Sequence, residues 1–233
     1  KLVVISEDGT LLYSLYGSNE GNPLQSVINM LKKLYSEKPK DAIIRFSGVT
    51  GYGEKLIQTA LNVDLNEIET IAHFTAAQEF MPNVTSIVDI GGQDTKIIAV
   101  DNGAVQDFLM NDKCSAGTGR FLEIMANTLS MRPNEMCELA REGSGVTISS
   151  MCTVFAESEV ISLIGQGEKK ENIAFAVVDS IVRKVAAQAN RMSEDRPMLC
   201  LTGGLCECSY ISEALTKELG MEVKTDPQSR YAG

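Results

Sequence analysis

A turn with paired glycines and two acidic residues lies near the middle of the 233-residue chain. The apolar run Ile87–Ile90 stops at Gly91 and Gly92, and Asp89 and Asp94 flank the turn. Glycines leave backbone N–H groups open to the close approach of a phosphate. Carboxylates beside such a turn can hold a hydrated Mg²⁺ ion. The pattern predicts a cradle for nucleotide phosphates and magnesium, and an ordinary tight turn is the alternative for a single Gly-Gly pair.

A cysteine follows this turn after one predicted hairpin. A strand over 96–100 turns at Asp101-Asn102-Gly103, a strong hairpin signal, into a third strand that ends near Met110. Cys114 then stands before a helix whose apolar face comprises Phe121, Leu122, Met125 and Leu129. We expect Cys114 to lie at the helix N-terminus, where the helix dipole favours a thiolate.

The other cysteines differ in their surroundings. Cys152 begins a predicted helix that runs to Gly165. Cys137 falls within an amphipathic helix and Cys200 within a core strand, so we expect both to be packing residues. The C-x-C pair Cys206 and Cys208 follows a second glycine pair, and we expect packing or surface thiols there. The single histidine, His73, excludes multi-histidine metal sites, and we expect it to be structural.

Composition excludes several classes of protein. The 44% hydrophobic content and six prolines indicate an ordered globular chain. A net charge of −10 argues against nucleic acid or an anionic membrane as the main partner. No apolar run approaches the ~20 residues of a membrane span, and no signal-peptide pattern is present. Six cysteines without regular pairing do not indicate a disulfide framework, so we expect a cytoplasmic protein.

Self-similarity and an α/β pattern predict two related domains. The segment KLVVISEDGTLLYSLY resembles KIIAVDNGAVQDFLM, since a lysine leads each strand and an acidic-glycine turn follows. We assign a first domain to residues 1–83 and a second, with the cysteines, to 84–233. Further helices are expected at 23–35, 54–61, 72–80, 133–141, 172–192 and 211–219, strands at 1–5, 11–16, 41–46 and 198–201, and a strand or extended loop at 146–150.

Four motifs together resemble one family. They are DIGGQDTK, NDKCSAGTGRFLEIMA, SSMCTVFAESEVIS and LTGG. The chain resembles, from Lys1 to Gly233, the activator ATPases of 2-hydroxyacyl-CoA dehydratases. These belong to the benzoyl-CoA reductase-related ATPase group of the acetate/sugar kinase–Hsp70–actin superfamily. The resemblance implies an α/β fold of two RNase H-like (actin-like ATPase) domains around a nucleotide cleft.

The resemblance also implies cofactors and partners. Family members are homodimers with one 4Fe–4S cluster between the subunits, and ATP hydrolysis drives a low-potential electron into a dehydratase or a related cluster reductase. Cys114 and Cys152 match the ligand motifs. A cubane cluster usually takes four thiolates, and two per chain in a two-fold dimer satisfy that number. The alternative is that both are ordinary buried cysteines.

The implied nucleotide site binds ATP or ADP with Mg²⁺. The resemblance assigns Gly91, Gly92, Gln93 and Asp94 to the second phosphate loop, and Gly203 and Gly204 to the adenosine side. Asp89 is expected to orient water or the metal ion, and Gln93 to position the attacking water. Such positioning supplies most of the catalysis in phosphoryl transfer, so no covalent nucleophile is needed.

The sequence departs from the family pattern at both ends. The Gly-Ser-Thr phosphate loop of the family would stand immediately before Lys1, and its last Gly-Ala helix after Gly233. We therefore expect a first domain without its first strand and first phosphate turn, and weak or absent ATP binding. Two other classes remain open: a sugar or acetate kinase, which would leave the cysteine motifs without a role, and a non-catalytic actin-like scaffold.

Overall fold

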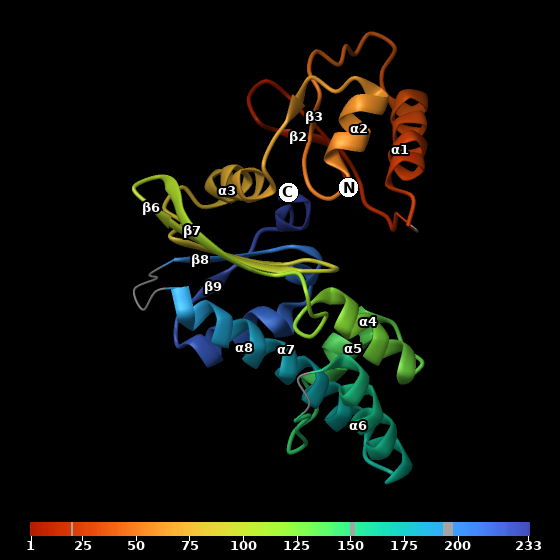
Figure 1. Ribbon diagram of the computed structural model, residues 1–233, viewed down its shortest axis with the longest axis vertical. Coiled ribbons are helices and arrows are strands. Elements are labelled where there is room, and N and C mark those ends of the chain that lie inside the picture. Colours follow the sequence, from red (N-terminus) through yellow and green to blue (C-terminus); the bar gives the residue numbers. More distant parts are fainter. Residues whose placement is uncertain (20, 150–151, 193–197) are drawn as a thin grey trace. The chain divides into compact units, whose positions relative to one another are not determined.

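The computed structural model describes residues 1–19, 21–149, 152–192 and 198–233. The chain has a mixed α/β fold and divides into two compact units (Figure 1). One comprises Lys1–Ala72 with Gly233, and the other comprises His73–Ala232. The domain assignment made from the sequence, with its boundary after residue 83, stays a prediction.

The first unit begins with the expected hairpin. Strand β1 (Leu2–Ile5) pairs antiparallel with β2 (Leu11–Leu15), and Gly9 adopts a φ of 86° in the turn between them. The predicted helices follow. The other elements are α1 (Pro23–Glu37), β3 (Gly48–Val49), α2 (Glu54–Leu61), β4 (Leu65–Asn66) and the start of α3 (Glu69–Phe80). The Asn22 side chain caps α1 by accepting a hydrogen bond from the Gln25 N–H at 3.1 Å.

The strand expected at 41–46 is absent, so that prediction was wrong. Residues 42–47 form neither helix nor strand, and Ile43 and Phe46 are 80% and 66% exposed. A short apolar run becomes a buried strand only when neighbouring strands and a covering layer meet it. Within the described ranges, β1 and β2 pair only with each other, and β3 begins later and pairs only with β4.

A five-stranded sheet forms the centre of the second unit, in the order β7-β6-β5-β8-β9. The strands are β5 (Ser86–Ile90), β6 (Thr95–Asp101), β7 (Ala104–Asn111), β8 (Leu199–Thr202) and β9 (Val223–Lys224). The first three form the predicted antiparallel meander, whereas β8 and β9 run parallel to β5. Asn102 and Gly103 both have positive φ, as a type I′ hairpin turn requires. Strand β9, only two residues long, was not predicted.

Helices cover both faces of this sheet (Figure 1). Val88 and Ile90 point into a large core with α7 and α8, while Ile87 and Ile98 pack with Phe74 of α3. The remaining elements are α4 (Gly119–Thr128), α5 (Pro133–Ala140), α6 (Thr153–Gly165), α7 (Lys170–Met192), α8 (Ser209–Leu219) and the 3₁₀ turns η1 (Gly204–Glu207) and η2 (Ser229–Tyr231). The predicted helices of this unit are confirmed. Residues 146–149 form a loop with neither helix nor strand, and Ser150 lies outside the described residues.

Candidate functional site

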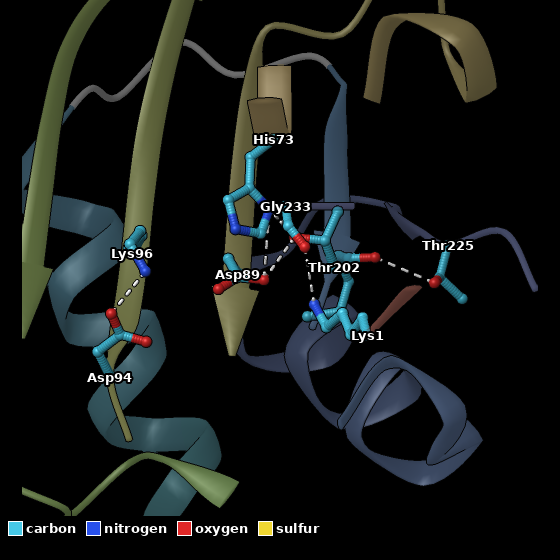
Figure 2. Close-up of polar contacts among 9 residues, drawn as sticks. Lys1, His73, Asp89, Asp94, Lys96, Thr202, Thr225 and Gly233 are labelled. Carbon is cyan, nitrogen blue, oxygen red and sulfur yellow. Dashed lines mark hydrogen bonds and ion pairs between the residues drawn. The ribbon is translucent and has the colours of Figure 1, made fainter. Parts of the chain in front are cut away.

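The parallel pairing of β5 and β8 brings two polar residues together at the strand ends. Asp89 faces Thr202 in register, and the Thr202 hydroxyl donates a 2.9 Å hydrogen bond to Asp89 Oδ1. His73 Nδ1 lies 3.6 Å from the same oxygen and 3.5 Å from Thr202 Oγ1 (Figure 2). All three residues are buried, and Asp89 is only 3% exposed. The aspartate predicted from the sequence therefore has a fixed orientation.

Gly203 has no room for a side chain. Its φ is +89°, and a Cβ atom there would lie 2.3 Å from the Ile90 carbonyl oxygen and 2.8 Å from Asp89 Oδ1. The absence of a side chain lets the end of β8 pass directly against the end of β5. Gly204, which is half-buried, begins η1 immediately afterwards. The second glycine pair thus adjoins Asp89 although more than a hundred residues separate them in the chain.

The first glycine pair forms a tight turn after β5. The Gly91 N–H donates to the Asp94 carbonyl oxygen at 2.9 Å. A Cβ atom on Gly91 would lie 2.6 Å from Asp94 Oδ1 and 3.5 Å from Asp89 Oδ2, so both carboxylates reach the same side of this glycine. Gly92 and Gln93 are exposed, and open space surrounds Gly92. Two converging carboxylates beside an open glycine are suitable for a hydrated divalent cation and a phosphate.

A buried lysine orients the second aspartate. Lys96 Nζ lies 2.5 Å from Asp94 Oδ2, and the lysine side chain is 2% exposed (Figure 2). A buried ammonium group requires a partner of opposite charge, which Asp94 supplies. Sequence reasoning did not assign Lys96, His73 or Thr202 to the site. The available signals were a lysine inside an apolar strand and a threonine immediately before a glycine pair.

The loop that follows Cys114 is bonded to the glycine turn. The Gly119 N–H donates to the Gly91 carbonyl oxygen, and the Arg120 N–H donates to that of Gly92, both at 2.9 Å. These donors belong to the first turn of α4, where N–H groups lack partners within the helix. The glycine turn and the first turn of α4, which follows the Cys114 loop, are therefore joined directly by backbone hydrogen bonds.

The two predicted ligand cysteines lie in adjoining segments. The Ser115 and Thr153 hydroxyls are 2.7 Å apart, so the residue after Cys114 is bonded to the residue after Cys152. Cys114 is half-buried, while Cys152 is exposed. Within the described part of the chain, no group of three or more cysteine, histidine or acidic residues could hold a metal ion.

The position expected for Cys114 needs correction. Cys152 is the N-cap residue of α6, as predicted, but α4 begins only at Gly119, with Thr118 as its N-cap. A turn separates Cys114 from the helix: the Thr118 hydroxyl and N–H both donate to the Ser115 carbonyl oxygen, and Gly117 has a φ of +86°. The glycine lets the chain turn back before it enters α4. The helix-dipole argument therefore applies to Cys152 and not to Cys114.

The family model for BadF/BadG/BcrA/BcrD ATPases matches residues 3–233. The chain belongs to this ATPase family. It is 38% identical over 218 residues to the (R)-2-hydroxyglutaryl-CoA dehydratase activating ATPase of Acidaminococcus fermentans, covering 93% of this chain and 82% of the relative. The expected family resemblance and the assignment to an ATPase family are confirmed.

Solved structures confirm the fold of this ATPase-family chain. The activator of 2-hydroxyisocaproyl-CoA dehydratase from Clostridium difficile, with bound ADPNP, matches with a TM-score of 0.85 and 31% identity. The match covers 99% of this chain and 85% of the activator. The ethanolamine utilization protein EutJ from Carboxydothermus hydrogenoformans, at 15% identity and a TM-score of 0.58, covers 90% and 71% and shares the fold alone. The predicted α/β actin-like ATPase fold is confirmed.

The other four cysteines of this family member are packing residues, as expected. Cys137, Cys200, Cys206 and Cys208 are all buried, which excludes the surface-thiol alternative. Burial raises the pKa of the Cys200 thiol to about 12. A hydrogen bond between Cys137 and Cys208 raises the pKa of Cys137 and lowers that of Cys208. None of the helices in the described ranges combines the length and apolarity that a membrane crossing needs.

Proposed function

We propose that this chain is an ATP-dependent electron-transfer activator of a 2-hydroxyacyl-CoA dehydratase or a related cluster reductase in the cytoplasm. It hydrolyses ATP and delivers a low-potential electron to that partner. Membership of the ATPase family and the similarity to two proteins named as dehydratase activators support the proposal.

The nucleotide half of the proposal uses the turn at the end of β5. Gly91, Gly92 and Gln93 receive the phosphates and position the attacking water, while Asp89 and Asp94 hold Mg²⁺. Gly203 and Gly204 border the adenosine. The convergence of the two carboxylates on Gly91 and the open space around Gly92 support this assignment.

The redox half of the proposal uses Cys114 and Cys152 of two copies of the chain. A 4Fe–4S cluster takes four thiolates, and the described residues of one chain bring two cysteine segments together through the Ser115–Thr153 bond. The donor set therefore fits half of a cluster, and a two-fold homodimer would supply the other half. When bound, the cluster would supply a one-electron donor of low potential. The exposure of Cys152 supports a thiol accessible to a second subunit.

One observation supports the coupling of the two halves above all others. The hydrogen bonds from Gly119 and Arg120 to Gly91 and Gly92 connect the glycine turn to the first turn of α4, which directly follows the loop that contains Cys114. A kinase acting on a small molecule would leave the paired cysteine segments without a role, whereas the proposed activator uses them to hold the cluster.

Cysteine substitution tests the proposal. Cys114→Ala and Cys152→Ala should each abolish cluster binding, because each removes two of four ligands from a symmetric dimer. Iron and acid-labile sulfide are measured after anaerobic purification, together with the EPR signal of the reduced protein. Cys206→Ala is the matched control, since Cys206 is buried in the core of the same unit, and it should retain full iron content. Full iron content and an unchanged signal in either ligand variant would overturn the assignment.

A further inference from the structure

Lys184 of α7 directs its ammonium group at one of the proposed ligand cysteines. Its Nζ atom lies 3.7 Å from Cys114 Sγ, although 70 residues separate the two in the chain. In the described part of the chain, no carboxylate lies within ion-pair distance of Lys184, and Cys114 is the hydrogen-bond acceptor found for its ammonium group. Lys184 is half-buried, so water screens its charge only in part.

The cysteine loop is shaped to admit this lysine. Gly117 has a φ of +86°, and a Cβ atom there would lie 3.3 Å from both Cγ and Cδ of Lys184. Any larger residue at this position would press on the aliphatic part of the lysine side chain. The glycine thus serves two purposes: it turns the chain back toward α4, and it leaves room for Lys184 to reach Cys114.

Neighbouring charges on α7 do not cancel that of Lys184. Arg183 forms its own ion pair with Asp179, one turn earlier on the same helix. Arg191 lies two turns beyond Lys184, and both line a cavity of about 440 Å³ together with Ser149. The sulfur of Cys114 therefore lies beside a net positive side-chain environment in a chain whose overall charge is −10.

We propose that Lys184 is a positioning residue that holds Cys114 and raises the reduction potential of the cluster bound there. This inference rests on the proposed function. A reduced cluster carries one more negative charge than an oxidised one, so a nearby cation stabilises the reduced form. Hydrogen bonds to ligand sulfur act in the same direction. Lys184 lies on α7 and contacts the sulfur of Cys114 through its ammonium group. It can therefore change the potential of the cluster without being a ligand.

The test compares three variants in the homodimeric protein. Lys184→Met removes the charge and keeps the length, Lys184→Arg keeps the charge, and Arg191→Met removes a charge from the same helix and cavity without a contact to Cys114. Each is purified anaerobically, checked by circular dichroism and assayed for iron and sulfide. Its potential is then measured by redox titration followed by EPR. We expect a more negative potential in Lys184→Met, a much smaller shift in Arg191→Met and a near wild-type value in Lys184→Arg.

The outcomes separate this inference from the proposed function. Wild-type protein without iron and sulfide would reject the proposed function itself. A loaded wild type, with Lys184→Met shifted no further than Arg191→Met, would overturn only the role of Lys184. So would a Lys184→Arg variant that behaves like Lys184→Met. Loss of the cluster from Lys184→Met alone, with Lys184→Arg and Arg191→Met fully loaded, would support the requirement for a positive charge at this sulfur.

Discussion

Asp89 is held in one orientation by contacts within the protein. Oδ1 of Asp89 accepts a hydrogen bond from the Thr202 hydroxyl and lies near His73 Nδ1. Oδ2 points toward Gly91. In the proposed phosphoryl transfer, an acid that is already oriented would need little reorganisation. At the scale of single residues, the site combines one fixed acid with one acid that a buried lysine orients.

In the full-length protein, Asp89→Asn should slow ATP hydrolysis in the presence of Mg²⁺. The amide keeps the size of the side chain but loses the charge that holds the metal or the water, so we expect a loss of about 100-fold in kcat. Steady-state phosphate release measures the effect, and the midpoint of thermal unfolding reports on the fold. Asp101→Asn, in the exposed hairpin turn at the end of β6, is the control and should keep full activity. Equal rates in the two variants would exclude Asp89 from the reaction.

Strands β5 and β8 place Asp89 beside the second glycine pair because their ends meet, and Gly203 makes this close approach possible. Strands β5 and β8 pair over four residues, and Gly203 continues β8 past the Ile90 carbonyl oxygen at a distance no side chain tolerates. The ends of β5 and β8 are thus packed tightly together, and the glycine turn follows directly from the end of β5.

Gly203→Ala should destabilise the protein through both backbone strain and a steric clash. The added methyl group would press on the Ile90 carbonyl oxygen, and we expect a loss of about 2–4 kcal/mol in the free energy of unfolding. Gly220→Ala separates the two causes. Gly220 also has a positive φ, of 66°, but its Cβ atom would meet nothing within 4 Å, so about 1 kcal/mol is expected. Denaturant unfolding measures both, and equal losses would contradict the proposed clash.

In the second unit as a whole, hydrogen bonds connect the glycine turn after β5 with the segments that contain Cys114 and Cys152. The turn after β5 is bonded to the start of α4, and the loop before α4 is bonded to the start of α6. A movement of the phosphate turn must therefore be accommodated at the cysteine segments. Coupling of this kind shifts an equilibrium only when nucleotide binds the two conformations with different affinities.

Nucleotide should therefore change the exposure and the potential of the cluster. We expect iron to be removed by a chelator faster with an ATP analogue than with ADP or without nucleotide, because the cysteine segments move with the phosphate turn. Chelation rates and reduction potentials of the full-length protein in the three states measure the effect. Identical values in all three would reject the coupling and leave both binding sites intact.

Local sequence determined much of this protein. Periodicity predicted the helices, Asn102-Gly103 predicted the hairpin between β6 and β7, and the glycine pairs marked the turns that meet at Asp89. Such features depend on neighbours in the chain, so their signals lie within a few residues. The motifs were also sufficient to identify the family.

Tertiary structure decided the rest, because it depends on contacts between distant segments. The segment 41–46 contains Ile43, Ile44 and Phe46 and ends at Ser47 and Gly48, which predicted a strand, yet no neighbouring strand pairs with it in the described ranges. The short strand β9 has almost no pattern of its own and exists because β8 pairs with it. His73 and Lys184 reach Asp89 and Cys114 only after the sheet and α7 have packed. A side chain's partner across the fold is set by packing, which no local pattern records.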